Sequence, residues 1–245
     1  MLNRFTSLFG FSLTKIRDLD LPKDFDSEKI ELIKAVSPYT MTSPERIASL
    51  NEAVKYIIRN NVEGDFVECG VWKGGSTLAM ALTLEKLGIE NRKLFLYDTF
   101  EGMSDPTEAD KDLNNNSAKD LLQTNSKKKS AVWAYSGLDE VKRTMSLSKY
   151  DLNNFIYVKG KVEETMLSSN HQKIALLRLD TDWYESTKIE LDVLFPKLVS
   201  GGVLIIDDYG YWQGARKAVD EYIELNNIKI LLNRIDYTGR IAIKI

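Results

Sequence analysis

The chain has 245 residues and a formal net charge of −3, with 43% hydrophobic and 28% charged side chains. This composition supports a folded core, and the lack of a basic block disfavours a protein that binds nucleic acid or an anionic membrane. A single cysteine, Cys69, excludes a disulfide framework and a cysteine zinc cluster, and a single histidine, His171, excludes zincin-type sites. No apolar run is long enough to span a membrane and no secretory signal is recognised. We therefore expect a cytoplasmic protein.

Apolar spacing and turn residues predict alternating strands and helices after residue 40. Thr42–Glu45 has capping-box spacing and begins a helix whose apolar face runs to Ile58. We expect Gly201 and Gly202 to lie in a turn just before the strand predicted at residues 203–206. Short apolar runs predict strands, and periodic segments between them predict helices. We expect strands at residues 66–69, 94–97, 155–158, 174–179 and 203–206, and helices at about 77–87, 186–198 and 214–225.

The end of the chain has a different pattern. Apolar residues alternate over 228–232 and again over 241–245, with Asp236–Gly239 between them, which predicts an antiparallel β-hairpin. Alternating β/α units closed by such a hairpin predict an α/β fold with a seven-stranded, mostly parallel sheet and helices on both faces. This is the outline of the Rossmann-like class I S-adenosylmethionine-dependent methyltransferase fold. A fold outline does not by itself fix a function.

Two segments stand outside the alternation. The first forty residues have mixed polarity without a clean period, so we interpret 1–40 as an N-terminal cap and 41–245 as the main domain. The polar stretch from Thr99 to about Lys129 predicts a surface insertion, with a lid containing some helix over about 101–130. A solvated acidic loop is an equally good interpretation of that stretch.

Acidic residues lie at the carboxyl ends of four predicted strands, where open α/β sheets bind their ligands. They are Glu68, Asp98, Asp180 with Asp182, and Asp207 with Asp208. Stability alone gives no reason to place carboxylates at that edge. We therefore expect the functional site there.

A glycine-rich turn, Gly70–Ser76, follows the first strand. The dinucleotide pattern G-x-G-x-x-G fails because Trp72 stands at its second glycine, and the Walker pattern fails because Ser76 replaces its lysine. Glycines at this place let a ligand approach the backbone, and the next helix N-terminus favours an anionic group. The acid before them, Glu68, suits a cationic amine such as that of S-adenosylmethionine.

The other strand-end acids suggest a nucleoside and a metal. Asp98 ends the second strand, where a carboxylate can accept hydrogen bonds from ribose hydroxyls. Asp180, Asp182 and the pair Asp207–Asp208 end two strands expected to be neighbours. Carboxylates converging in one cleft repel each other unless neutralised, and a hard divalent cation, Mg²⁺ first, fits an all-oxygen site.

Other residues carry weaker signals. We expect His171 to be a surface loop residue and Cys69 to be small and buried. Trp183, Tyr184 and Trp212 either wall an acceptor pocket or pack at the sheet edge.

Five motifs in order carry a family resemblance from about residue 38 to the end of the chain. They are PYTMTSPER at 38–46, FVECGVWKGGS at 66–76, YDTFEGM at 97–103, LRLDTDWYEST at 177–187 and GGVLIIDDY at 201–209. In these motifs the chain resembles the macrocin O-methyltransferase (TylF-type) family. Its members are class I, Mg²⁺-dependent enzymes that use S-adenosylmethionine to methylate a sugar hydroxyl.

The resemblance implies roles for particular residues. It implies a metal site formed by Asp180, Asp207 and Asp208, and catalysis by Asp182 as general base, although either Asp180 or Asp182 could face the metal. It also implies a homo-oligomer and a small-molecule or glycan acceptor. The cofactor S-adenosylmethionine would be bound by Met41, Thr42, Glu68, Gly70, Gly74, Gly75, Ser76, Asp98, Thr99, Gly160, Lys161 and Val162.

Elementary chemistry agrees with this reading. A sugar hydroxyl is a poor nucleophile at neutral pH, so a chelating cation and a nearby carboxylate base would activate it. Two alternatives remain open: a non-catalytic carbohydrate-binding protein on the same fold, and a nucleotide-dependent sugar-modifying oxidoreductase. The acid cluster and the failed dinucleotide pattern disfavour the second.

Overall fold

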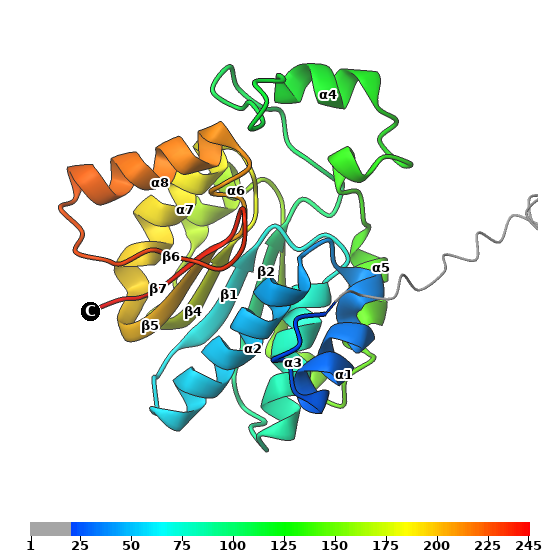
Figure 1. Ribbon diagram of the computed structural model, residues 1–245, viewed down its shortest axis with the longest axis vertical. Coiled ribbons are helices and arrows are strands. Elements are labelled where there is room, and N and C mark those ends of the chain that lie inside the picture. Colours follow the sequence, from blue (N-terminus) through cyan, green and yellow to red (C-terminus); the bar gives the residue numbers. More distant parts are fainter. Residues whose placement is uncertain (1–20) are drawn as a thin grey trace, which may run out of the picture.

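The computed structural model describes residues 21–245, and residues 1–20 of the predicted cap, which was expected over 1–40, lie outside that range. Seven strands form one sheet in the order β3-β2-β1-β4-β5-β7-β6 (Figure 1). The first five strands in this order are parallel to one another, whereas β7 is antiparallel to both β5 and β6. The predicted fold class is confirmed. The strands are β1 (Asp65–Cys69), β2 (Leu94–Asp98), β3 (Phe155–Lys159), β4 (Ile174–Leu179), β5 (Leu198–Ile206), β6 (Asn233–Arg234) and β7 (Arg240–Ile243).

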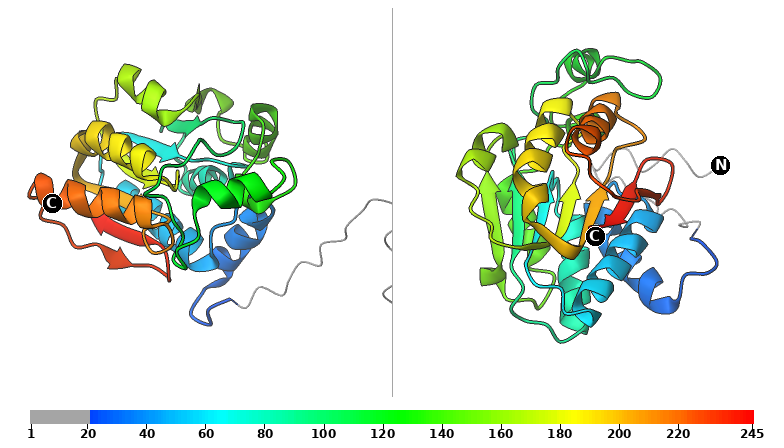
Figure 2. Two further views of the ribbon diagram at one scale, coloured as in Figure 1. Left: turned by 90° about the horizontal axis from the view of Figure 1, so that it is seen from above. Right: turned by 90° about the vertical axis from the view of Figure 1, so that its left-hand side faces the viewer.

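Helices cover both faces of the sheet, as the right-hand view of Figure 2 shows. One apolar cluster joins the sheet to α1 (Ser27–Val36), α2 (Pro44–Arg59), α3 (Gly75–Lys86) and α5 (Leu138–Met145). A second cluster joins the other face to α6 (Val162–Thr165), α7 (Tyr184–Leu194) and α8 (Gln213–Leu225). Within residues 21–245, no helix is both long and apolar enough to cross a membrane.

The segment between β2 and α5 stands above the carboxyl ends of the strands (Figure 1). It contains α4 (Ala118–Thr124), so the helix expected within this insertion is present. Two of its acids fasten it to the body. Asp110 accepts a hydrogen bond from the first amide of α7, Tyr184 N, at 2.7 Å, and Asp112 pairs with Trp212 in an isolated bridge.

Four sequence expectations need correction. The hairpin turn at Asp236–Gly239 is confirmed, but residues 228–232 form no strand; their apolar side chains pack against the second cluster instead. Gly201 and Gly202 lie inside β5 rather than before it, because they exchange backbone hydrogen bonds with Lys244. The helix expected over 186–198 ends at Leu194, where a 3₁₀ turn that contains Pro196 begins. The cap of α2 is Ser43, whose hydroxyl accepts from Arg46 N, and not Thr42.

His171 needs a fifth correction, because it is buried and not on the surface. Its Nε2 lies 2.9 Å from the Tyr97 hydroxyl, and its ring packs edge-on against Phe95. Cys69 is buried, as expected.

Candidate active site

A cavity of about 430 Å³ lies where the parallel strands end. Its walls come from the segment before α2, the turn after β1, the loops after β2, β3, β4 and β5, the insertion and the hairpin turn. The strand order puts the ends of β1, β4 and β5 next to one another, so acids far apart in sequence meet at one edge. The site expected at the carboxyl ends of the strands therefore coincides with this cavity.

Ten of the twelve residues expected to bind the cofactor line this cavity. They are Met41, Thr42, Glu68, Gly70, Ser76, Asp98, Thr99, Gly160, Lys161 and Val162. All four acids expected at the metal and catalytic positions line it too, namely Asp180, Asp182, Asp207 and Asp208.

Gly74 and Gly75 are not among the residues lining the cavity. Gly74 caps α3 with φ +87°, in the left-handed region, and a Cβ there would lie 2.7 Å from the Met145 side chain on α5. A Cβ on Gly75 would lie 2.5 Å from the Tyr39 carbonyl oxygen. Both positions therefore favour glycine, because a side chain there would collide with a neighbouring part of the structure.

Asp98 holds the glycine-rich turn as well as facing the cavity. Its Oδ2 accepts from the amides of Val71 at 2.7 Å and Trp72 at 3.1 Å, and its Oδ1 accepts from Phe100 N at 2.6 Å. The two amides use both lone pairs of Oδ2, whereas Oδ1 has a second lone pair that a ribose hydroxyl could use. Burial raises the pKa of Asp98, and the three amides oppose that rise.

The acids after β4 and β5 converge. Asp180, Asp207 and Asp208 each offer one oxygen, and these oxygens lie within 4.8 Å of one another. Burial, followed by the neighbouring carboxylates, raises the pKa of Asp180 and of Asp208 well above the ordinary value. Asp182 has φ +71° and turns back toward Asp208, and burial raises its pKa to about 7.

Two arginines form ion pairs with this acidic cluster. Arg178 Nη1 lies 2.6 Å from Glu68 Oε1 and 2.8 Å from Asp180 Oδ2, and Nη2 lies 2.6 Å from Asp207 Oδ1. Arg46 pairs with Asp207 Oδ2 through Nη1, and its Nε lies 3.0 Å from Asp236 Oδ2.

The charges in this cluster do not balance. Among residues 21–245, the network joins Arg46 and Arg178 to a larger set of carboxylates, which are Glu68, Asp180, Asp182, Asp207, Asp208 and Asp236. Such an excess of buried negative charge is relieved by protons or by a bound cation. The all-oxygen donor set fits a hard divalent cation such as Mg²⁺.

The profile of the macrocin-O-methyltransferase (TylF) family matches residues 25–242. The chain belongs to this family. The resemblance carried by the five motifs is thus confirmed, and the chain is a methyltransferase by family. The oxidoreductase alternative loses its support.

Several known methyltransferases are similar to this chain. Demethyldecarbamoylnovobiocin O-methyltransferase of Streptomyces niveus is 34% identical over 203 residues, covering 82% of this chain and 74% of that protein. The 8-demethyl-8-(2,3-dimethoxy-alpha-L-rhamnosyl)-tetracenomycin-C 4'-O-methyltransferase of Streptomyces olivaceus is 31% identical over 207 residues, covering 82% and 74%. The structure of the O-methyltransferase NovP matches with a TM-score of 0.72 at 31% identity, over 84% of this chain and 82% of that chain.

The sequence pattern did not predict which residues form ion pairs and hydrogen bonds with the acids of the site. Glu68 lines the cavity, yet its oxygens already accept from Arg178 and from the Thr77 hydroxyl. Arg178 could have been noticed as a charged residue inside the otherwise apolar run Ile174–Leu179. No comparable signal marks Arg46, whose role depends on where α2 packs.

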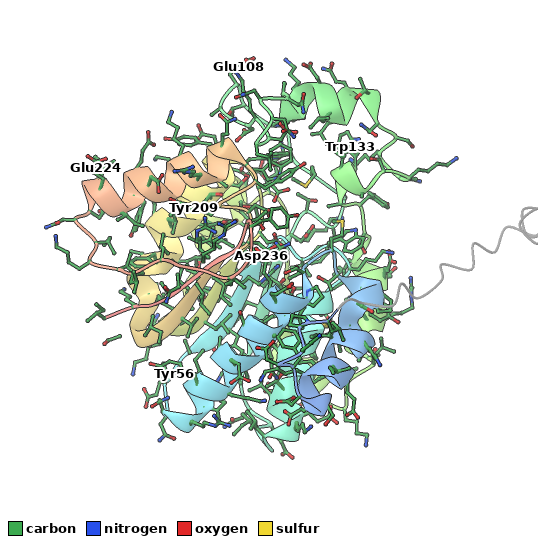
Figure 3. The ribbon with its side chains drawn as sticks, in the orientation of Figure 1. Tyr56, Glu108, Trp133, Tyr209, Glu224 and Asp236 are labelled. Carbon is green, nitrogen blue, oxygen red and sulfur yellow. The ribbon has the colours of Figure 1, made fainter. Side chains whose placement is uncertain are left out.

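Trp183 and Trp212 pack against each other near the acids. Trp183 and Trp212 stack edge to face, with ring centroids 4.9 Å apart, in a small apolar cluster with α4. Trp183 Nε1 donates to the Ser104 carbonyl oxygen at 3.0 Å. Trp212 also lines the cavity, whereas the Tyr184 hydroxyl pairs with Glu221. Figure 3 labels Trp133 and Glu108, which both belong to the insertion between β2 and α5.

Proposed function

We propose that this protein is an S-adenosylmethionine- and Mg²⁺-dependent O-methyltransferase that acts on a sugar hydroxyl of a glycoside. The observation that carries the proposal is the convergence of Asp180, Asp207 and Asp208 beside Asp182, in the same cavity as Asp98. The relatives support the acceptor class, since one of them is named for a rhamnosyl tetracenomycin and its 4'-oxygen.

The residues around the cavity fit the cofactor. Asp98 would accept hydrogen bonds from the ribose, beside the turn it holds in place. Thr99, Gly160, Lys161 and Val162 line the part of the cavity after β2 and β3. S-adenosylmethionine, when bound, supplies an electrophilic methyl group on a sulfonium. The segment Met41–Thr42 would cover it, with the Thr42 hydroxyl held by Arg178 Nη2 at 3.0 Å.

The acids would hold the cation and take the proton. Asp180, Asp207 and Asp208 would be its ligands, and Mg²⁺ would lower the pKa of neighbouring sugar hydroxyls and orient them. Asp182 would accept the proton of the attacking hydroxyl, because a base with a pKa near the working pH transfers protons efficiently. The wall of the insertion and Trp212 would keep water away from that hydroxyl.

Methyl transfer from labelled S-adenosylmethionine to a panel of glycosides with vicinal hydroxyls tests this function. We expect labelled product with Mg²⁺, none with EDTA, and recovery when Mg²⁺ is restored. Asp208→Asn should abolish transfer and leave S-adenosylhomocysteine affinity nearly unchanged, while Asp192→Asn, on the exposed side of α7, serves as the matched control. Full activity in EDTA would refute the metal requirement.

A further inference from the structure

The turn of the C-terminal hairpin is organised by one buried carboxylate, Asp236. Its Oδ1 accepts from the amides of Gly239 at 2.6 Å and Thr238 at 2.9 Å, which closes the turn. Its Oδ2 accepts from the Ser43 hydroxyl at 2.7 Å and lies 3.0 Å from Arg46 Nε. Asp236 therefore joins the turn to the first turn of α2.

The same turn is bonded to the loop that carries Asp207 and Asp208. Gly210 N donates to the Thr238 carbonyl oxygen at 2.9 Å, and a Cβ on Gly210 would lie 2.3 Å from the Tyr237 carbonyl oxygen. Arg240, just past the turn, places its guanidinium 4.8 Å from the centre of the Tyr209 ring. Figure 3 labels Asp236 and Tyr209 near the middle of the molecule, between α2 and α8.

Arg46 completes a closed path through these elements. Its Nη1 binds Asp207 Oδ2 while its Nε binds Asp236, and its side chain is only 9% exposed. Arg178 binds the other oxygen of Asp207, so both oxygens of that carboxylate are held by guanidinium groups. Each oxygen keeps a second lone pair, so this bonding fixes the carboxylate and still leaves it able to bind a cation.

We propose that the Arg46–Asp236 pair is a positioning unit: it sets the Asp207–Asp208 loop in the geometry that binds the divalent cation. The inference rests on the metal requirement of the proposed function. Neither Arg46 nor Asp236 belongs to the converging ligand set of Asp180, Asp207 and Asp208. Partners of this kind, which orient a ligand without touching the metal, typically contribute ten- to hundredfold to metal affinity.

If Arg46 acted through its charge alone, its replacement would change metal affinity in the opposite direction. A guanidinium bound to a metal ligand repels an incoming cation, so removing its charge would tighten metal binding if charge alone mattered. The positioning role predicts weaker binding. The sign of the change therefore separates the two roles.

Mn²⁺ binding followed by electron paramagnetic resonance tests the proposal on the intact chain without an acceptor. We expect Arg46→Gln and Asp236→Asn each to weaken Mn²⁺ binding about tenfold or more. The double variant should bind no more weakly than the weaker single variant, because the two residues act as one unit. Lys55→Gln is the matched control: it removes one charge from a buried position on the same helix, where Lys55 pairs with Glu28 at 3.0 Å.

Arg46→Lys covers the case in which Arg46→Gln does not fold. It keeps the charge, but a single ammonium cannot reproduce the two-ended contact with Asp207 and Asp236, so the same weakening is expected. A lower unfolding midpoint with unchanged Mn²⁺ affinity in Arg46→Lys and Asp236→Asn would reduce the pair to a structural role and overturn the inference. Tighter binding by Arg46→Gln would also overturn it. Both results leave the metal requirement standing, whereas a wild-type protein that binds no Mn²⁺ would refute both proposals.

Discussion

Arg178 and Glu68 face each other across the centre of the sheet, with Nη1 2.6 Å from Oε1 and side chains only 2% and 1% exposed. The parallel register of β1 and β4 pairs these two positions directly. Because Arg178 also reaches Asp180 and Asp207, it ties the strand before the glycine-rich turn to the acids of the candidate metal site. A cation in this position holds together groups that would otherwise repel one another.

Replacing Arg178 should therefore destabilise the fold strongly. In Arg178→Met, Glu68 and Asp180 lose their guanidinium partner and Asp207 keeps only Arg46. Removing one member of a buried ion pair typically costs about 3–5 kcal/mol. Urea unfolding measures the loss. Lys188→Met, which removes an exposed pair with Asp192 on α7, should cost less than about 0.5 kcal/mol. Similar unfolding curves for both variants would contradict this role of Arg178.

Asp98→Asn should weaken cofactor binding. The amide can still fill the space, but it loses the negative charge to which a ribose hydroxyl would donate. A hydrogen bond to a charged group is worth about 1.5–3 kcal/mol, so we expect roughly a ten- to hundredfold rise in Kd for S-adenosylhomocysteine by calorimetry. Asp120→Asn, at an exposed position of α4, should leave that Kd unchanged. An unchanged Kd in Asp98→Asn would show that the ribose does not bind at Asp98.

Stability should depend on pH through Asp182. Its pKa rises from 3.8 to about 7 on folding, so the native state holds this proton more tightly than the unfolded state does. The stabilisation is complete below the unfolded pKa and is lost as the pH rises through about 7. Bound Mg²⁺ would offset the repulsion among the ionised acids. We therefore expect Mg²⁺ to raise the unfolding midpoint more at about pH 8 than at about pH 6.

Asp182→Asn is the control for this pH dependence. It should flatten the change in the unfolding midpoint between those two pH values in EDTA. An Mg²⁺ effect that is equal at both pH values in the wild-type protein would contradict the expected coupling between proton loss and cation binding.

The insertion should matter for the acceptor more than for the cofactor. Asp110 is buried and accepts from Tyr184 N, at the start of α7, and from Thr107 within the insertion. Asp110→Ala removes this helix cap at a cost of about 1 kcal/mol and loosens the insertion. Once an acceptor is known, its KM should rise while the Kd of S-adenosylhomocysteine stays constant. A parallel loss of S-adenosylhomocysteine affinity would indicate that the insertion supports cofactor binding instead.

The sequence was sufficient to predict the five parallel strands and the acids at their ends. Hydrophobic runs ending on Asp98, Asp180 and Asp207 mark a sheet edge because strand order in α/β folds follows simple rules. The hairpin turn was also recognisable, since Asp236–Gly239 is a strong turn sequence. The alternation over 228–232 misled because packing against one apolar cluster imposes the same period as a strand.

Residue partners across the sheet were beyond the reach of sequence patterns. The Glu68–Arg178 pair depends on the register of β1 against β4, and the Arg46–Asp236 pair joins residues 190 positions apart through tertiary packing. His171 looked exposed because its neighbours are polar, yet the loop turns it inward to Tyr97. Which residues pair follows from the three-dimensional arrangement, and the one local signal is the charge of Arg178 inside an apolar strand.

The most direct test of the account is thermal unfolding of the purified protein with S-adenosylhomocysteine, with NAD⁺ and with Mg²⁺, separately and together. A ligand that binds only the native state raises the midpoint by mass action. We predict a clear rise with S-adenosylhomocysteine, a further rise when Mg²⁺ is added, and none with NAD⁺. No rise with S-adenosylhomocysteine, with or without Mg²⁺, would contradict the proposed methyltransferase activity.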